Sequence, residues 1–208
     1  MITINVLRID DIEKYQNQNS LNLSEEELNK AKSYIHKEDQ LRSIGGTLLI
    51  NAFTSPGQIL HTKEGKPCKQ SGLKFNISHS GDYVIISLAK QEVGVDIQKI
   101  INANEKIINH CLTNSEKERL NKNEDFTRFW VLKESFVKCL GTGFSIRPNK
   151  IESAKENNVP YKFENEDYIS FVTKFHDDYY IGLTYKRNSV EEIQINEVKV
   201  EEIVGKLK

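Results

Sequence analysis

The chain has 208 residues, 29 Lys and Arg against 30 Asp and Glu, and a formal net charge of −1. This balance argues against the nucleic-acid-binding class, which usually carries a basic excess, and a hydrophobic content of 38% argues against intrinsic disorder. No apolar run approaches the roughly 20 residues of a membrane-spanning helix.

The first hundred residues predict a strand, two helices and three further strands. Residues 2–9 alternate apolar and polar side chains, which is typical of a strand. Ser24 and Glu27 have the spacing of a capping box and predict a helix that runs to residue 36. A second helix is expected at 37–53, where Gly45 and Gly46 indicate a close approach of another backbone. Short strands are expected at 74–78, 83–89 and 93–97, joined by turns at Gly81-Asp82 and Gln91-Glu92.

After Ile100 the order of helices followed by strands begins again. Helices are expected at 105–111, 115–121 and 125–140, with Gly141 as the C-cap of the last. Strands are expected at 161–164, 169–176, 179–185 and 192–200. The pattern therefore predicts an α+β fold with an N-terminal half at 1–102 and a C-terminal half at 103–208.

The three cysteines are an odd number without CxxC spacing, which is typical of reduced intracellular thiols. The first nine residues also lack the basic start and long apolar region of a signal peptide. These features predict a soluble cytoplasmic protein that binds neither nucleic acid nor membrane.

Asp96 is the first residue with a chemical interpretation. It lies in Val93-Gly94-Val95-Asp96-Ile97-Gln98, and in a strand Asp96 and Gln98 point to the same face. A carboxylate and an amide oxygen on one face are suitable ligands for Mg²⁺. Any half-buried strand alternates in this way, so an ordinary strand end remains the alternative.

Glu134 and Lys138 share a helix face with Trp130, at a spacing of four residues. The same spacing is also that of an ordinary exposed ion pair. The apolar residues around the pair favour partial burial, and buried charges need a metal ion or strong partners.

Residues 75–82 (FNISHSGD) gather hydrogen-bonding side chains and a glycine at a strand end. Ser78 and His79 are adjacent in a strand and point to opposite faces, so they cannot act together as nucleophile and base. A phosphate or nucleotide contact and a plain polar turn both remain open. The usual nucleotide-binding glycine motifs are absent from the sequence.

Taken together, these segments resemble a known family. Their order is His36-Lys37-Glu38-Asp39 with Arg42, then Gly65-Lys66-Pro67, then FNISHS at 75–80, then Gly94-Val95-Asp96-Ile97, then Trp130-x-x-Lys133-Glu134-x-x-x-Lys138. Between about Ser24 and Gly143 the chain resembles 4′-phosphopantetheinyl transferases of the Sfp type. The C-terminal third carries no motif.

The resemblance implies an enzyme of the holo-[acyl-carrier-protein] synthase type. Such an enzyme moves the 4′-phosphopantetheine arm of coenzyme A to a serine of an apo acyl or peptidyl carrier protein and releases adenosine 3′,5′-bisphosphate. The implied fold is a pseudo-dimer of two similar α+β halves, with the active site at their interface. A monomer is expected, and fatty-acid, polyketide and nonribosomal-peptide carriers all remain open as partners.

The resemblance also implies roles for individual residues. Asp96 and Glu134 are expected to bind Mg²⁺, and Lys138 is expected to hold the pyrophosphate of coenzyme A. A Mg²⁺ held by carboxylates, together with a lysine, stabilises the charge that builds on the departing phosphate. The remaining contacts to coenzyme A are expected from Ser78, His79, Arg42 and Lys30 at the 3′-phosphate end and from Lys66 and Pro67 along the adenine.

Three points stay open within this resemblance. The family often has a glutamate proposed as general base where Glu116 stands, and either Glu116 or a metal-bound water takes the serine proton. Many members also have a glutamate where this chain has Gln98, so the metal site is expected to carry one charge less. Glu27 stands where a lysine can help to bind coenzyme A, which leaves more of that contact to Lys30.

Two alternatives compete with an active transferase. One is a silent relative that binds coenzyme A or a carrier protein without catalysis. The other is an unrelated α+β binding protein with a chance series of motifs. The presence of Asp96, Glu134 and Lys138 together favours the active enzyme.

Overall fold

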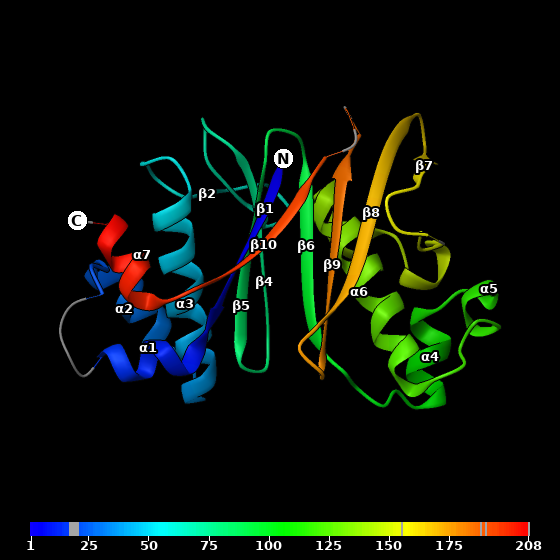
Figure 1. Cartoon of the computed structure of the whole chain (residues 1–208), viewed down its shortest axis with the longest axis horizontal. Coiled ribbons are helices and arrows are strands. Elements are labelled where there is room, and N and C mark those ends of the chain that lie inside the picture. The colour runs from blue at the N-terminus through cyan, green and yellow to red at the C-terminus, as the bar shows by residue number, and fades with distance from the viewer. Residues whose placement is uncertain (17–20, 155, 188, 190, 208) are drawn as a thin grey trace.

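Two four-stranded sheets face each other between two layers of helices (Figure 1). This computed structural model describes residues 1–16, 21–154, 156–187, 189 and 191–207. The first sheet has the order β10-β1-β5-β4, with β1 (Ile2–Arg8), β4 (Lys74–Ser80), β5 (Tyr83–Ala89) and β10 (Ile193–Val198). The second has the order β6-β9-β8-β7, with β6 (Val93–Lys99), β7 (Pro160–Phe163), β8 (Glu166–Phe175) and β9 (Tyr179–Lys186).

Each sheet has its own helices on its outer face. The first is covered by α1 (Ile9–Gln16), α3 (Lys37–Phe53) and α7 (Val200–Lys206), with α2 (Glu25–Lys32) against α3. The second is covered by α6 (Asn123–Leu140), while α4 (Glu105–Cys111) and α5 (Asn114–Lys117) lie at the outer end of the molecule (Figure 1). The remaining elements are the hairpin β2 (Leu60–His61) and β3 (Pro67–Cys68) and the 3₁₀ turns η1 (Gly143–Ser145) and η2 (Pro148–Lys150).

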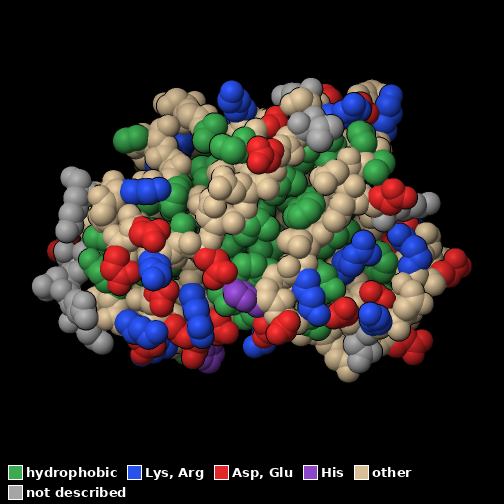
Figure 2. All heavy atoms as spheres, viewed as in Figure 1, with side chains coloured by type: hydrophobic (Ala, Val, Ile, Leu, Met, Phe, Trp, Pro, Cys, Tyr) green, Lys and Arg blue, Asp and Glu red, His purple; other side chains and the backbone are tan. Residues whose placement is uncertain are grey.

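The hydrophobic pattern explains this layering. Val84, Ile86 and Leu88 of β5 pack against the helices, while Ile85 of the same strand packs between the two sheets. A strand buried on both faces needs apolar residues at successive positions, and β5 has them. Among the described residues, the charged side chains other than Asp96, Glu116 and Lys133 are at least partly exposed, and both signs are interspersed on the face shown in Figure 2. Within the described chain, no helix combines the length and the apolar character needed to cross a membrane.

The predicted α+β class is confirmed. In both halves a long helix follows the first strand, and that strand then pairs antiparallel with the last strand of a hairpin: β1 with β5, and β6 with β9. This shared order is what a pseudo-dimer requires, although the pseudo-dimer and the division at residue 102 stay predictions. Sheet membership changes between β5 and β6, and β10 and α7 return to the first half.

Most of the predicted elements agree with the structure, and α3 and α4 have the expected bounds. Ser24 forms the predicted capping box, but α2 ends at Lys32, and α5 is shorter than expected. Helices α1 and α7 were not predicted, because each is a short segment that directly follows a strand. The prediction that Gly45 and Gly46 meet another backbone is wrong, since their nearest neighbours are the side chains of Ile12, Val84 and Ile77.

Two other glycines do allow a helix backbone to touch the second sheet. A Cβ atom on Gly94 of β6 would lie 2.1 Å from the carbonyl oxygen of Ser135, and one on Gly182 of β9 would lie 2.4 Å from that of Val131. Real Cβ atoms do not approach backbone so closely. The short separation between α6 and the sheet is therefore possible only because both positions are glycine. The contact also turns the face of β6 that carries Gly94 and Asp96 toward α6.

We predict that Gly94→Ala lowers the free energy of unfolding by about 3 kcal/mol or more, because neither backbone can move away alone. Gly205→Ala in α7 is the matched control, since a Cβ there meets nothing within 4 Å. That variant should match or slightly exceed wild type, because alanine favours helix over glycine. Urea unfolding measures both, and equal midpoints for Gly94→Ala and wild type would contradict the close contact.

Candidate active site

The two sheets meet where the edge strands β4 and β6 lie side by side, and side chains rather than backbone pairs join them. Asn76 Oδ1 accepts the backbone N–H of Val95 at 2.9 Å. Ser78 Oγ accepts that of Ile97 at 3.4 Å, and Ser80 Oγ accepts that of Lys99 at 3.0 Å. We call these three contacts the seam. Edge strands leave every second N–H unpaired, and the seam satisfies these donors on β6.

A charged cluster lies on the seam. Asp96 is 5% exposed, and its Oδ1 accepts hydrogen bonds from Ser78 Oγ at 2.7 Å and from Lys138 Nζ at 2.6 Å. Lys138 Nζ also donates to Ser78 Oγ at 2.9 Å. A buried carboxylate needs such partners, and here they come from β4 in one half and from α6 in the other. The structure therefore brings Asp96, Lys138 and Ser78 into direct contact.

Glu134 lies one helical turn before Lys138 on α6 and is half-buried. Burial raises the pKa of its carboxyl to about 7, the negative charge of Asp96 adds to the shift, and Lys138 opposes it. Within the described residues Glu134 has no hydrogen bond or ion pair. Two carboxylates that repel one another in a partly buried place are a site at which a cation is favoured.

The donor set available for a metal ion is small. Gln98 is on the same face of β6 as Asp96 and is half-buried, so Asp96, Glu134 and Gln98 are the oxygen donors of this region. The described residues contain no group of three or more His, Cys, Asp and Glu side chains that could hold a metal ion by themselves. Mg²⁺ commonly takes one or two carboxylates and completes its shell with waters and substrate phosphates, and the residues present fit that pattern.

A cleft of about 730 Å³ lies on the other face of β4. Because side chains alternate along a strand, Asn76, Ser78 and Ser80 face the seam while Ile77 and His79 line the cleft. The cleft is formed by α2, α3, β4 and the segment around the β2–β3 hairpin. Its basic side chains are Lys30, Arg42, His61 and His79, and its apolar wall includes Ile50, Ile59, Pro67, Ile77 and Val84.

Arg42 is held in place on one side of this cleft. Its Nη1 donates to the carbonyl oxygen of Gly81 at 2.8 Å, and its Nη2 donates to Asp39 Oδ1 at 2.6 Å. The guanidinium in turn lowers the pKa of Asp39. His79 is exposed at the cleft wall, where partial desolvation and then the charges of Arg42 and Lys138 lower its pKa. A guanidinium has five N–H donors, so Arg42 keeps free donors for an anion.

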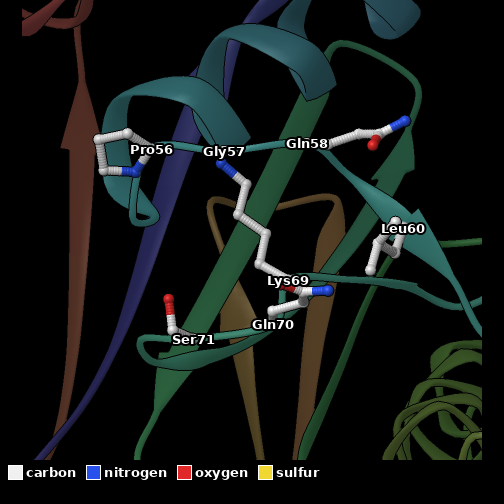
Figure 3. Close-up of a pocket in the computed structure, with 7 residues that line it drawn as sticks. All are labelled: Pro56, Gly57, Gln58, Leu60, Lys69, Gln70 and Ser71. Atoms are coloured by element: carbon white, nitrogen blue, oxygen red, sulfur yellow. The ribbon is translucent and has the colours of Figure 1, made fainter.

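A smaller pocket of about 160 Å³ adjoins the cleft and shares Gly57 and Gln58 with it (Figure 3). Lys69 reaches across this pocket, and its Nζ donates to the carbonyl oxygen of Ser55 at 2.6 Å. Burial lowers the pKa of the Lys69 ammonium. The bond ties the 55–58 segment to the segment after β3 and so fixes this rim of the cleft.

Lys66 lies on the β2–β3 hairpin but reaches into the other half. Its Nζ approaches the carbonyl oxygens of Val93 at 3.2 Å and Cys139 at 3.5 Å, and Glu92 Oε2 at 3.4 Å. Cys139 is in the last turn of α6, where a cation is favoured by the helix dipole. Lys66 thus connects the hairpin to the end of α6, while its neighbour Pro67 lines the cleft.

Comparison with known proteins agrees with this geometry. Residues 92–184, which include Asp96, Gln98, Glu116, Glu134 and Lys138, match a sequence model of the 4′-phosphopantetheinyl transferase superfamily. Over this segment the chain is similar to members of that superfamily. The matched segment begins at the β5–β6 connection and ends within β9, so it covers the charged cluster but not the cleft.

Several characterised superfamily members align with more of the chain. The 4′-phosphopantetheinyl transferase gsp of Aneurinibacillus migulanus is 27% identical over 201 residues, which cover 88% of this chain and 85% of gsp. Sfp of Bacillus subtilis (strain 168) is 31% identical over 140 residues, or 60% of this chain and 62% of Sfp. The human L-aminoadipate-semialdehyde dehydrogenase-phosphopantetheinyl transferase is 28% identical over 157 residues, or 61% of this chain and 51% of the human protein.

Glu116 lies in a different environment from the one the superfamily resemblance led us to expect for a base. It is fully buried and forms an ion pair with Lys133 Nζ at 2.6 Å. Its Oε2 also accepts the backbone N–H of Thr113 at 2.8 Å, and its Oε1 accepts that of Ser153 at 2.9 Å. Lys133 Nζ donates further to the carbonyl oxygen of Pro148 at 2.8 Å. Both carboxylate oxygens are therefore engaged, and α5 lies far from the seam (Figure 1).

Two further sequence expectations need adjustment. Ser78 was expected at the 3′-phosphate with His79, but its hydroxyl lies in the seam, bonded to Asp96. Lys66 was expected along the adenine, but its ammonium contacts the end of α6. Sequence reasoning overlooked Asn76 and Ser80, although the polar side chains at 76, 78 and 80 alternate as residues of one strand face do.

We predict that Glu116→Gln lowers the free energy of unfolding by about 3 kcal/mol or more, because it leaves the buried Lys133 charge without its counterion. Glu166→Gln is the matched control, since the pair of Glu166 with Lys186 at 2.9 Å is exposed, and exposed pairs contribute less than about 1 kcal/mol. Chemical denaturation of the two variants and wild type provides the comparison. A loss below about 1 kcal/mol for Glu116→Gln would show that the carboxylate does not serve as a structural counterion.

Proposed function

We propose that this protein transfers the 4′-phosphopantetheine arm of coenzyme A to a serine of an apo carrier protein and releases adenosine 3′,5′-bisphosphate. One observation carries the proposal. Asp96, Glu134 and Lys138 gather on one face of β4, and a cleft with Arg42 and His79 opens on the other. A ligand with a phosphate on the 3′ oxygen and a pyrophosphate on the 5′ oxygen of one ribose suits two such neighbouring sites.

The cleft has the properties of a binding site for the adenosine end of coenzyme A. Its volume is within the range of roughly 300–1,000 Å³ that is usual for small-molecule sites. Arg42 and Lys30 offer cationic groups to the 3′-phosphate, His79 offers a ring N–H donor, and Pro67 offers an apolar surface to the adenine. The proposal places no direct phosphate contact on Ser78, because its hydroxyl is used in the seam.

The reaction is a displacement at the phosphorus that carries the pantetheine. The serine oxygen forms a bond to this phosphorus, and the bond to the bridging oxygen breaks, with its electron pair staying on adenosine 3′,5′-bisphosphate. Lys138 is proposed to stabilise the charge that grows on the departing phosphate. Asp96 and Glu134, with Gln98 as a neutral third donor, are proposed to hold a Mg²⁺ that supplies Lewis-acid stabilisation of the pyrophosphate.

The serine must lose a proton in this step. Glu116 is poorly placed to take it, because the side chain is fully buried and both oxygens already accept hydrogen bonds. The proposal therefore gives Glu116 a structural role and leaves the proton to a water molecule beside the charged cluster. The proposed enzyme is cytoplasmic and monomeric, and the proposed partner on which it acts is an apo acyl or peptidyl carrier protein.

One incubation tests the proposal. The protein is mixed with coenzyme A, Mg²⁺ and a panel of apo acyl and peptidyl carrier proteins, and each carrier is weighed by mass spectrometry. A mass gain equal to one phosphopantetheinyl group supports the proposed transfer. This gain should not occur when a chelator is present from the start of the incubation. Binding of coenzyme A without any mass gain would identify a silent relative, and no binding at all would remove the function.

We predict that Asp96→Asn and Glu134→Gln each abolish carrier loading while the far-ultraviolet circular dichroism stays that of wild type. Each variant keeps the shape of the side chain and removes a charge proposed to bind the metal ion. Glu166→Gln, an exposed carboxylate of β8, is the control and should load carriers normally. Near-normal loading by Asp96→Asn or by Glu134→Gln would refute the site assignment.

A further inference from the structure

The turn between β4 and β5 touches both halves of the molecule. On one side, Arg42 of α3 donates from Nη1 to the carbonyl oxygen of Gly81 at 2.8 Å. On the other, the backbone N–H of Asp82 donates to the hydroxyl of Tyr179 at the start of β9, at 3.1 Å. That hydroxyl in turn donates to Asp82 Oδ2 at 3.3 Å. The turn is therefore held between a cleft residue of the first half and a tyrosine of the second.

Tyr179 is itself fixed in position. Its side chain is 1% exposed, and its ring packs edge-on against Tyr83 with centroids 5.0 Å apart. Gly81 has a φ of +52°, and a Cβ atom there would lie 2.2 Å from the tyrosine hydroxyl oxygen. The hydroxyl thus fills the space that a side chain at position 81 would need, so the turn and the tyrosine form one packed unit.

We propose that Tyr179 is a positioning residue for the anion-binding end of the cleft. By fixing the Gly81-Asp82 turn it fixes the carbonyl oxygen that, with Asp39, orients the guanidinium of Arg42. Arg42 lines the cleft, and its remaining N–H donors are available there to an anion. The inference rests on the proposed function, because the anion is taken to be the 3′-phosphate of coenzyme A. It gives the second half a part in binding a group that only first-half residues contact.

The test compares binding of coenzyme A with binding of dephospho-coenzyme A, which lacks the 3′-phosphate, by calorimetry without a carrier protein. Wild type should prefer coenzyme A. Tyr179→Phe should reduce this preference by about three- to tenfold, the worth of one ordinary hydrogen bond. Affinity for dephospho-coenzyme A should not change. A purely structural loss would weaken both ligands alike and leave their ratio at the wild-type value, which would overturn the proposal.

Tyr185→Phe is the matched control. Tyr185 is also a fully buried tyrosine of β9 whose hydroxyl accepts a backbone N–H, that of Glu191 at 3.3 Å, but it does not contact the turn. The ratio of the affinities of Tyr185→Phe for coenzyme A and dephospho-coenzyme A should remain that of wild type. Asp82→Ala is the second variant, for use where Tyr179→Phe does not fold. It removes only the Oδ2 acceptor and should shift the ratio in the same direction, and an unshifted ratio would count against the proposal.

A double variant tests whether Tyr179 acts through Arg42. In an Arg42→Ala background, Tyr179→Phe should leave the ratio unchanged, because the group that it positions is gone. A further drop in that background would show that the tyrosine acts by another route. If wild type shows no preference for coenzyme A, the proposed ligand is wrong and the inference falls with it. If wild type prefers coenzyme A and Tyr179→Phe does so equally, only the inference fails.

Discussion

Side-chain hydrogen bonds from one edge strand to the backbone of another hold the candidate site together. β4 and β6 belong to different sheets, and Asn76, Ser78 and Ser80 satisfy N–H groups of β6 that would otherwise be unpaired, the first two of them in a buried place. This arrangement gives β4 two distinct faces. One carries Ser78 to Asp96, and the other carries His79 to the cleft. Two neighbouring sites of different chemistry therefore arise from a single strand.

The second constraint is the closeness of α6 to the sheet. Glycines at 94 and 182 allow backbone contact between α6 and the sheet. This contact brings Glu134 and Lys138, on two consecutive turns of α6, close to Asp96. The consequence is electrostatic. Lys138 pairs with Asp96, while Glu134, which lies within range of the same carboxylate, is left with a raised pKa. Charges that are unfavourable by themselves are typical of sites that bind a charged ligand.

Much of this could be predicted from the sequence where the determinants are local. The bounds of α3 and α4, the capping box at Ser24 and the alternation of β1 follow from periodicity and caps within a few residues. The family resemblance also selected Asp96, Glu134 and Lys138, and the structure brings these three together. The resemblance to the superfamily, suggested by the order of motifs, is confirmed by the match at 92–184.

The rest depends on partners that are distant in the chain. The short turn expected at Gln91-Glu92 carries the chain from one sheet to the other, because β6 pairs with β9, more than 80 residues later. The resemblance suggested Glu116 as a general base, and only the fold shows that it forms a buried ion pair with Lys133. Ser78 and His79 looked like one ligand site, but the alternation of a strand whose opposite faces meet different halves separates them.

The most direct test of this account is amide hydrogen exchange at Val95, followed by NMR in wild type and in Asn76→Ala. The account holds that the Asn76 side chain, and not another strand, protects this N–H. Loss of the side chain should therefore speed exchange at Val95 by about tenfold or more, while the amide of Ile181 in the interior of β9 keeps its wild-type rate. Equal protection of Val95 in the two proteins would contradict the seam on which the site depends.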